Sequence, residues 1–272
     1  MTAINTNVGA LNARLYTLSA NNAQEKAMER LSSGKRVNSA ADDAAGLAVA
    51  GKMESQLRGI NMAIRNNQDG VGLIQTAEAG INEVRNMVLR IRELAVQMAN
   101  GIYEDSPDRA NAQLEVEALQ AQVNLIAGYT RFNDVSLLNG SFSAVDIQAG
   151  NTTSETIALT ITTMTTTGLG FDSVSVSTQS NAQAAITTMD TALTDIATEQ
   201  ATLGSYTNRL NYSVANLSRS SVMTEQALGR IMDADFASES TALSKAQILN
   251  QAATAMLAQA NQSKNLMLQL IN

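Results

Sequence analysis

Apolar residues recur along most of this chain at alternating steps of three and four, the spacing of helices that pack along one seam. The longest run lies in the second half of the chain. At 1.5 Å per residue, a helix over this run would be roughly 75 Å long, and so sustained a heptad predicts a coiled-coil partner. The run consists of Ile186, Met189, Leu193, Ile196, Leu203, Leu210, Val214, Leu217, Leu228 and Ile231.

The partner helix is predicted in the first half of the same chain, where two heptad stripes follow one another. A three-residue step separates the stripes, which overwinds a supercoil locally. Asn67 falls in the first stripe, where a polar residue fixes the register of a coiled coil. The first stripe is Ala50, Met53, Leu57, Ile60, Ile64, Val71 and Ile74, and the second is Ala77, Ile81, Val84, Val88, Ile91, Ala95 and Met98.

A shorter helix and a small β element are predicted to complete this rod. Gly101 and Pro107 separate the first long helix from an apolar stripe that runs from Ala112 to Ile126. The helical pattern then stops between about 129 and 180, where short strands are predicted to turn at Asn139-Gly140. The sequence therefore predicts a mainly α fold, a long antiparallel coiled-coil rod with a β-hairpin element.

The two ends of the chain resemble each other, because each carries one narrow apolar stripe and few charges. We expect the two stripes to pair, yet a single seam between short helices buries little surface, so each end needs further neighbours. This predicts a terminal domain over residues 1–40 and 236–272, a rod domain over 41–235, and a chain that forms filaments. The stripes are Ile4, Val8, Leu11, Leu15 and Leu18 at the start, and Leu249, Ala253, Met256, Leu257, Ala260, Met267 and Leu270 at the end.

The stretch "LSSGKRVNSAADDAAG", residues 31–46, combines features of a phosphate loop and of a carboxylate site. It lacks the upstream glycine and the following Ser or Thr of a P-loop. Ser39 and Asp42 have the spacing of a capping box, and Asp43 adds negative charge where a helix N-terminus favours it. We therefore interpret this stretch as a capped joint between the terminal helix and the rod.

Composition excludes most catalytic and nucleic-acid functions. The 272 residues include neither histidine nor cysteine, and the formal net charge is −7. The commonest general base, metal ligand and thiol nucleophile are therefore missing, and an acidic chain is a poor partner for nucleic acid or an anionic membrane. The first twenty residues have neither the apolar run of a secretion signal nor that of a membrane span. We expect no enzyme activity, no cofactor and no metal.

Several blocks of the sequence resemble bacterial flagellin. They cover about the first 140 and the last 90 residues, in the order found in that family. The blocks are "INTNVGALNA", "LSSGKRVNSAADDAAGLAVA", "QDGVGLIQTAEAGINEV", "RIRELAVQMANG", "NRLNYSVANL", "RIMDADFASE" and "SKAQILNQAATAMLAQANQ". The sequence departs from the family at Asp134, where a glycine usually follows Phe-Asn, and at Glu199 and Gln200, near a common arginine.

This resemblance implies a minimal flagellin with terminal-helix and rod domains only, which polymerises into the extracellular filament of the flagellum. It also implies type III export, and as partners an export chaperone, a cap protein and hook–filament junction proteins. Two alternatives stay open: a hook–filament junction protein, and a secreted coiled-coil protein that does not polymerise.

The resemblance further implies recognition of the monomer by the vertebrate Toll-like flagellin receptor. The matching positions are Arg90 and Leu94 in "RIRELAV" and Glu115 on the following helix. Arg90 and Leu94 are four residues apart and share a helix face. Because the predicted seam takes Val88, Ile91 and Ala95, we expect this face to be exposed and to serve also as a subunit contact.

Overall fold

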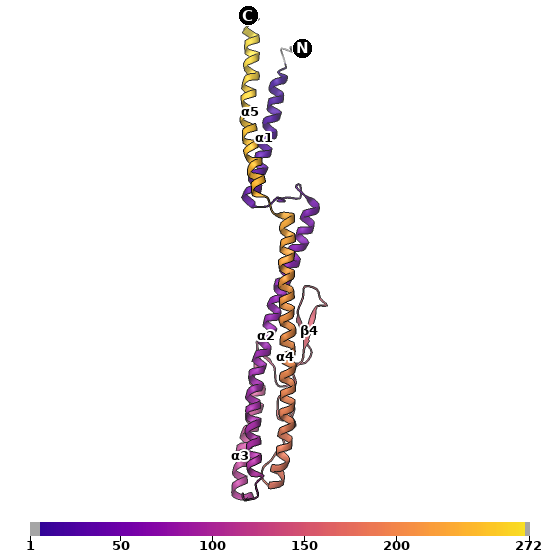
Figure 1. Ribbon diagram of the computed structural model, residues 1–272, viewed down its shortest axis with the longest axis vertical. Coiled ribbons are helices and arrows are strands. Elements are labelled where there is room, and N and C mark those ends of the chain that lie inside the picture. Colours follow the sequence, from indigo (N-terminus) through magenta and orange to yellow (C-terminus); the bar gives the residue numbers. More distant parts are fainter. Residues whose placement is uncertain (1–5, 270–272) are drawn as a thin grey trace. The chain divides into compact units, whose positions relative to one another are not determined.

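The computed structural model describes residues 6–269 of the chain, with side chains up to Ser263. The chain divides into two compact units (Figure 1). A terminal unit contains the residues up to Leu57 and those from Val222 onward, and a rod unit contains Arg58–Ser221. The two longest helices each contribute to both units. The predicted division at 40/41 and 235/236, which follows the breaks between helices, stays a prediction.

The terminal unit is built on an antiparallel pair of helices, α1 (Val8–Ser33) and α5 (Phe236–Gln269). Helix α1 begins at a cap in which the Asn7 side chain accepts a hydrogen bond from the Ala10 N–H at 3.0 Å. It ends at Gly34, whose φ of 69° is the left-handed conformation that glycine adopts without strain. The pairing of helices from the two ends of the chain agrees with the sequence analysis.

The rod unit is a bundle formed by parts of α2 (Ala44–Met98) and α4 (Gln179–Met232) together with α3 (Ala110–Tyr129). A short turn, η1 (Asp105–Arg109), leads into α3. Helices α2 and α4 are antiparallel, since Arg92 binds Asp190 while Asn61 binds Ser221. None of the described helices combines the length and the hydropathy that a bilayer crossing requires.

The predicted rod seam forms the core of this unit. The whole second stripe of α2, from Ala77 to Met98, is buried, and so are Met189, Ile196, Leu203 and Leu210 of α4. Heptad spacing places large aliphatic side chains on one face of a helix, and another helix must cover that face to remove it from water. The heptad pattern therefore identified the seam. The predicted fold class is confirmed.

The β element consists of two antiparallel pairs within 131–159. Strand β1 (Arg131–Phe132) pairs with β2 (Val135–Ser136), and β3 (Val145–Gln148) pairs with β4 (Thr156–Leu159). The first hairpin turns at Asn133 and Asp134, which both have positive φ. The predicted turn at Asn139-Gly140 is therefore wrong as a hairpin: Asn and Asp tolerate the left-handed conformation, and two such residues in succession suit a tight hairpin.

Candidate functional site

Helices α1 and α5 contact each other through alanines. Ala13, Ala20 and Ala27 of α1 are buried, as are Ala246 and Ala253 of α5. The alanines of each helix are seven residues apart, so they form one straight seam along which small side chains let the two backbones approach closely. The Asn7 side chain donates to the Ala260 carbonyl at 3.0 Å, and Asn250 bonds to Asn21 across the same seam.

The predicted apolar stripe of α1 does not form this seam. Val8, Leu11, Leu15 and Leu18 are exposed, with Leu15 retaining 64% of its accessible surface. The expectation that this stripe pairs with α5 within one chain is therefore wrong. The physical reason is that the alanine face lets the helices come closer than leucines would, which leaves the larger side chains on the outside.

On α5 the predicted stripe divides between the seam and its edge. Ala253 is buried, Leu257 and Ala260 are half-buried, and Leu249 and Met256 are exposed. Ile4 and Leu270, together with the side chain of Met267, lie outside the described residues.

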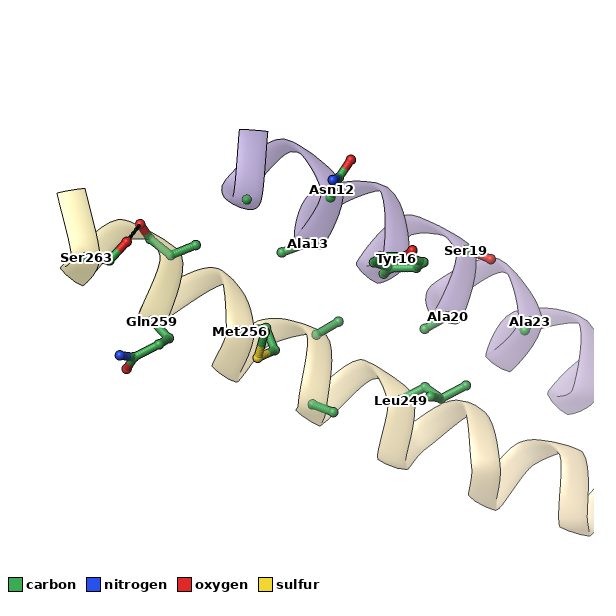
Figure 2. A pocket seen from close by; sticks show the side chains of 14 residues that line it. Asn12, Ala13, Tyr16, Ser19, Ala20, Ala23, Leu249, Met256, Gln259 and Ser263 are labelled. Carbon is green, nitrogen blue, oxygen red and sulfur yellow. Dashed lines mark hydrogen bonds between the residues drawn. The ribbon is translucent and has the colours of Figure 1, made fainter. Parts of the chain in front are cut away.

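An apolar groove of about 650 Å³ runs along the α1–α5 pair (Figure 2). Seam alanines form its floor, Tyr16 of α1 lines one side, and Leu249 and Met256 of α5 line the other. The lining includes Asn12, Ser19, Gln259 and Ser263 but no charged residue. An uncharged groove with exposed apolar walls has the chemistry of a surface that another apolar element covers.

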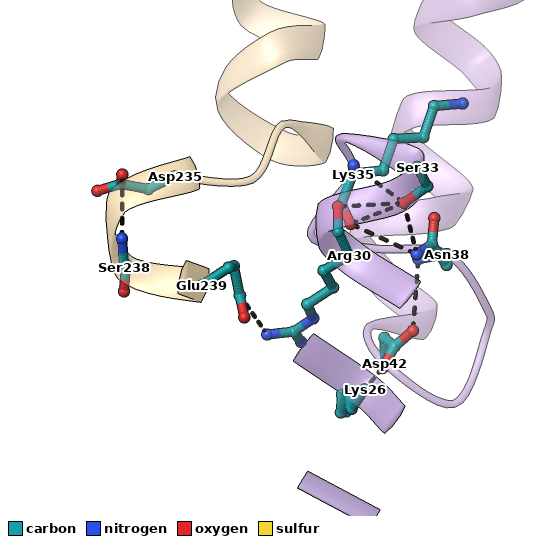
Figure 3. A network of polar contacts seen from close by, with 9 residues as sticks. All are labelled: Lys26, Arg30, Ser33, Lys35, Asn38, Asp42, Asp235, Ser238 and Glu239. Atoms are coloured by element: carbon teal, nitrogen blue, oxygen red, sulfur yellow. Dashed lines mark hydrogen bonds and ion pairs between the residues drawn. The ribbon is translucent and has the colours of Figure 1, made fainter. Parts of the chain in front are cut away.

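The joint between α1 and α2 is held by charged groups within the terminal unit (Figure 3). Lys26 contacts the Asp42 carboxylate at 2.7 Å, and the Asn38 and Ser39 backbone N–H groups donate to the same carboxylate. These contacts, led by the one with Lys26, hold the pKa of Asp42 well below its ordinary value. Arg30 binds Glu239 of α5 at 2.8 Å.

Helix α2 begins after Asp43, whose carboxylate accepts a hydrogen bond from the Gly46 N–H at 2.8 Å. The predicted helix start at Ser39 is therefore wrong by four residues. Asp42 does accept the Ser39 N–H, as in a capping box, but the residues between them form a turn outside the helix. Asp43 therefore caps α2, while Asp42 anchors the joint to α1 through Lys26.

Comparison with known proteins decides the family. Residues 4–143 match the model of the bacterial flagellin N-terminal helical region, and residues 186–271 match that of the C-terminal helical region. The chain belongs to the bacterial flagellin family. It is 40% identical to a flagellin of Halalkalibacterium halodurans and 40% identical to a flagellar filament core protein of Brachyspira hyodysenteriae, and each alignment covers 98% of this chain and 99% of the relative.

A solved structure agrees with this assignment. The crystal structure of Bacillus cereus flagellin is similar with a TM-score of 0.51 and 32% identity, over 56% of this chain and 88% of that one.

The three residues that the family resemblance singled out occupy two different environments in this flagellin. Arg90 binds Glu115 of α3 at 2.9 Å and Glu93 at 3.2 Å, and these two carboxylates raise its pKa. The Arg90 and Glu115 side chains are 49% and 45% exposed. Leu94, in contrast, is 4% exposed. The expected exposure of Leu94 is wrong, because α3 lies against α2 at this level and widens the buried face beyond the seam with α4.

Three buried polar residues in the flagellin rod form further local networks. Asn67 donates to the Ala63 and Ala149 carbonyls, which ties α2 to the residues after β3 and agrees with its predicted seam position. Glu199 accepts from the Thr162 N–H at 3.2 Å and from its hydroxyl at 2.7 Å. Arg109, which the sequence analysis did not single out, donates to the Met98 and Asn100 carbonyls at the end of α2.

Within the described residues, no group of three or more His, Cys, Asp or Glu side chains could hold a metal ion. The α1–α5 surface, with its groove and exposed leucines, is the candidate functional site.

Proposed function

We propose that this chain is the structural subunit that polymerises into the helical filament of the bacterial flagellum, outside the cell, and serves motility mechanically without catalysing a reaction. This function rests on one observation, that the α1–α5 pair exposes its large apolar side chains and buries alanines. A row of exposed large apolar side chains beside an uncharged apolar groove is typical of a surface that another molecule covers. Relatives across nearly the whole chain are named flagellin and flagellar filament core protein, which supports the same function.

The filament-core residues in this proposal are those of the two terminal stripes. In the polymer, the exposed Val8, Leu11, Leu15 and Leu18 would contact neighbouring subunits, together with Leu249 and Met256. The half-buried Leu257 and Ala260 would lie at the edge of the pair, where a neighbouring subunit covers them. Membership of the family extends the same role to Ile4, Met267 and Leu270.

Electron microscopy tests the function directly. A purified preparation, concentrated under conditions that favour polymerisation, should form filaments with a hollow core. A preparation that stays monomeric at every concentration would favour the alternative of a secreted coiled-coil protein. Short, capped assemblies that never elongate would favour the hook–filament junction alternative.

Other partners follow from the same exposed surface. We propose that an export chaperone binds the uncharged face of α5 before secretion, and that cap and hook–filament junction proteins contact the terminal helices during assembly. The sequence from Ala246 to Ser263 contains no charged residue, so a chaperone for this segment needs an apolar groove of its own. Co-purification of the chaperone with wild-type chain, and its loss with Leu249→Asp, would support this contact.

We also propose that the monomer presents Arg90 and Glu115 to the vertebrate Toll-like receptor. These side chains are exposed and paired, whereas buried Leu94 would support the helix beneath them. Leu94→Ala is a poor test because it leaves a cavity in the rod core. Arg90→Ala should instead weaken receptor activation by monomer while leaving the melting temperature of the rod unchanged within about 1 °C, since exposed pairs contribute little to stability. Full activation by this variant would remove the receptor contact and leave the filament function intact.

A further inference from the structure

The α1–α5 pair carries two separate apolar surfaces. One is the groove described above, with Tyr16 on one side and Leu249 and Met256 on the other. The second, which we call the ridge, consists of Val8, Leu11, Leu15 and Leu18 on α1. The ridge residues keep steps of three and four, so they form one raised line along the helix.

The ridge points away from the seam. Leu11 and Leu15 are each two residues from Ala13, and Leu18 is two residues from Ala20. Two residues along an α-helix correspond to a rotation of about 200°, so the ridge lies on the opposite side of α1 from the buried alanines. Tyr16, in contrast, is three residues from Ala13 and four from Ala20, which places it at the edge of the seam, over the groove (Figure 2).

The two surfaces match in length and in chemistry. On α1 the groove extends from Gly9 to Ala23, about 21 Å at 1.5 Å per residue, and the ridge from Val8 to Leu18 is about 15 Å long. Neither surface includes a charged residue. Arg14 is the one charged residue between positions 8 and 24, and its long side chain can extend from the flank of the ridge into solvent.

We propose that the ridge of one subunit occupies the groove of the next subunit. This inference rests on the proposed function and specifies which surfaces meet. A groove with an alanine floor and without charges accepts an uncharged apolar helix face, and every copy of this chain supplies such a face in the ridge of α1. Leu15 and its neighbours would cover Tyr16, Leu249 and Met256, removing from water the apolar side chains that one chain leaves exposed.

The contact is heterologous, because it joins two different surfaces of the same unit. A subunit whose groove is filled still presents a free ridge, so the contact can repeat from subunit to subunit, and it builds an open helical filament when the rotation between subunits does not close a ring. Contact of one ridge with another ridge would instead be isologous and would stop at a dimer. The arrangement of the ridge and groove on different faces thus provides for an open polymer.

The absence of cysteine from the sequence allows a direct test by engineered cross-links. One preparation carries Leu15→Cys and a second carries either Met256→Cys or Leu249→Cys, the two groove positions one heptad apart. The preparations are mixed, polymerised and oxidised, and disulfide-linked dimers are counted on denaturing gels. Each chain has one thiol, so every disulfide joins two subunits. Leu18→Cys provides a second ridge position if Leu15→Cys does not enter filaments.

Efficient cross-linking is expected between a ridge variant and at least one groove variant, at least tenfold above that of the ridge variant mixed with Ile248→Cys. Ile248 is the matched control, since it is an exposed aliphatic residue of α5 that lies two residues from Ala246 and outside the groove. A single chain carrying both Leu15→Cys and the reactive groove substitution should give a ladder of covalent oligomers, as head-to-tail contacts require.

Three results would overturn parts of this scheme separately. Filaments that form normally but give no ridge-to-groove disulfide would overturn the inference and leave the filament function standing. A double-cysteine chain that stops at dimers would overturn the head-to-tail arrangement. Wild-type chain that never polymerises would overturn the proposed function itself.

Discussion

The two units of this molecule bury different kinds of side chain. In the rod unit the buried residues include large aliphatics and aromatics such as Ile74, Leu203 and Phe142. Among the described residues of the terminal unit, the buried apolar side chains belong to alanine with a single exception, Val37. These are Ala13, Ala20, Ala27, Val37, Ala50, Ala246 and Ala253. The same chain thus contains one unit that buries large apolar side chains and one that leaves many of them exposed or half-buried.

This difference separates folding from assembly. Burial stabilises by about 0.8 kcal/mol per methylene, while fixing each residue costs roughly 1 to 2 kcal/mol of conformational entropy. An alanine seam buries few methylenes, so its burial energy offsets little of that entropy cost. A seam of isoleucine, leucine and methionine buries more methylenes and offsets much more of it. The rod is therefore expected to be stable in the single chain, and the terminal unit to gain most of its stability from neighbours.

Limited proteolysis should reveal the largest difference between the units. Brief digestion of monomer is expected to remove about the first 40 and the last 40 residues and to leave the rod, because local opening costs little free energy where few large side chains are buried. A difference of about 4 kcal/mol in opening corresponds to roughly a thousandfold difference in cleavage rate. Assembled filament should protect both units. Equal cleavage rates at the ends and in the rod of the monomer would contradict the comparison.

Truncation of one leucine in each unit should separate their roles. Leu203→Ala removes a fully buried side chain and should lower the free energy of unfolding of the monomer by about 2 to 5 kcal/mol. Leu257 lies in the half-buried edge of the terminal unit. Leu257→Ala should change the free energy of unfolding of the monomer by less than about 1 kcal/mol. It should nevertheless raise the concentration that is needed for polymerisation. Thermal melting followed by circular dichroism measures the first effect and light scattering the second. Similar melting losses for both variants would remove the distinction.

A polar residue inside the rod should give an intermediate effect. Glu199→Ala leaves the Thr162 N–H and hydroxyl without their carboxylate acceptor. This loss should lower the free energy of unfolding by about 1 to 3 kcal/mol. Asp195→Ala is the matched control, since this residue lies one turn earlier on α4 and is exposed. Asp195→Ala should change the free energy of unfolding by no more than about 0.5 kcal/mol. Denaturant unfolding of both variants makes the comparison, and equal losses would show that Thr162 finds another acceptor.

The smallest effect is expected at the joint, and it depends on pH. Because Lys26 and neighbouring N–H groups lower the pKa of Asp42 in the folded chain, its contribution is present above the ordinary aspartate value of 3.8 and decreases as pH falls below that value. Wild-type joint should thus become more sensitive to cleavage near Lys35 as pH falls from about 4 to 2. An acid-active protease can measure this. Asp42→Asn should be sensitive throughout and should lose the pH dependence.

The rod could be predicted from the sequence because its seam uses the residues that a heptad search detects. Ile81, Val84 and Val88 recur at three and four, and each is large enough for its position to indicate burial. The register of the terminal pair could not be predicted in this way. Alanine occurs on several faces of α1, so Ala13, Ala20 and Ala27 do not stand out beside the leucine stripe, although they form the seam.

Two other expectations also differ from the structure, each for its own reason. Leu94 lies outside the two-helix seam yet is buried in the rod core, which heptad positions on α2 alone cannot reveal. The hairpin turn at Asn133-Asp134 was less evident than Asn139-Gly140, because Asn-Gly is the stronger turn signal in sequence. The candidate receptor residues came from family resemblance and the candidate assembly residues from the apolar stripes, while the groove and the outward position of the ridge became visible only with the fold.

The loop between β3 and β4 is a place where residues can be added to the chain. Gln148 and Thr156 face each other across the ladder, so the chain leaves and re-enters the rod at one point. The side chain of Asn151 lies against Gly59, where a β-carbon would collide with it, while Thr152, Thr153 and Ser154 are exposed. A segment of any size inserted after Thr153 would begin and end at the same spot on the rod surface. This hairpin is thus a natural site for grafting an extra domain onto an otherwise minimal subunit.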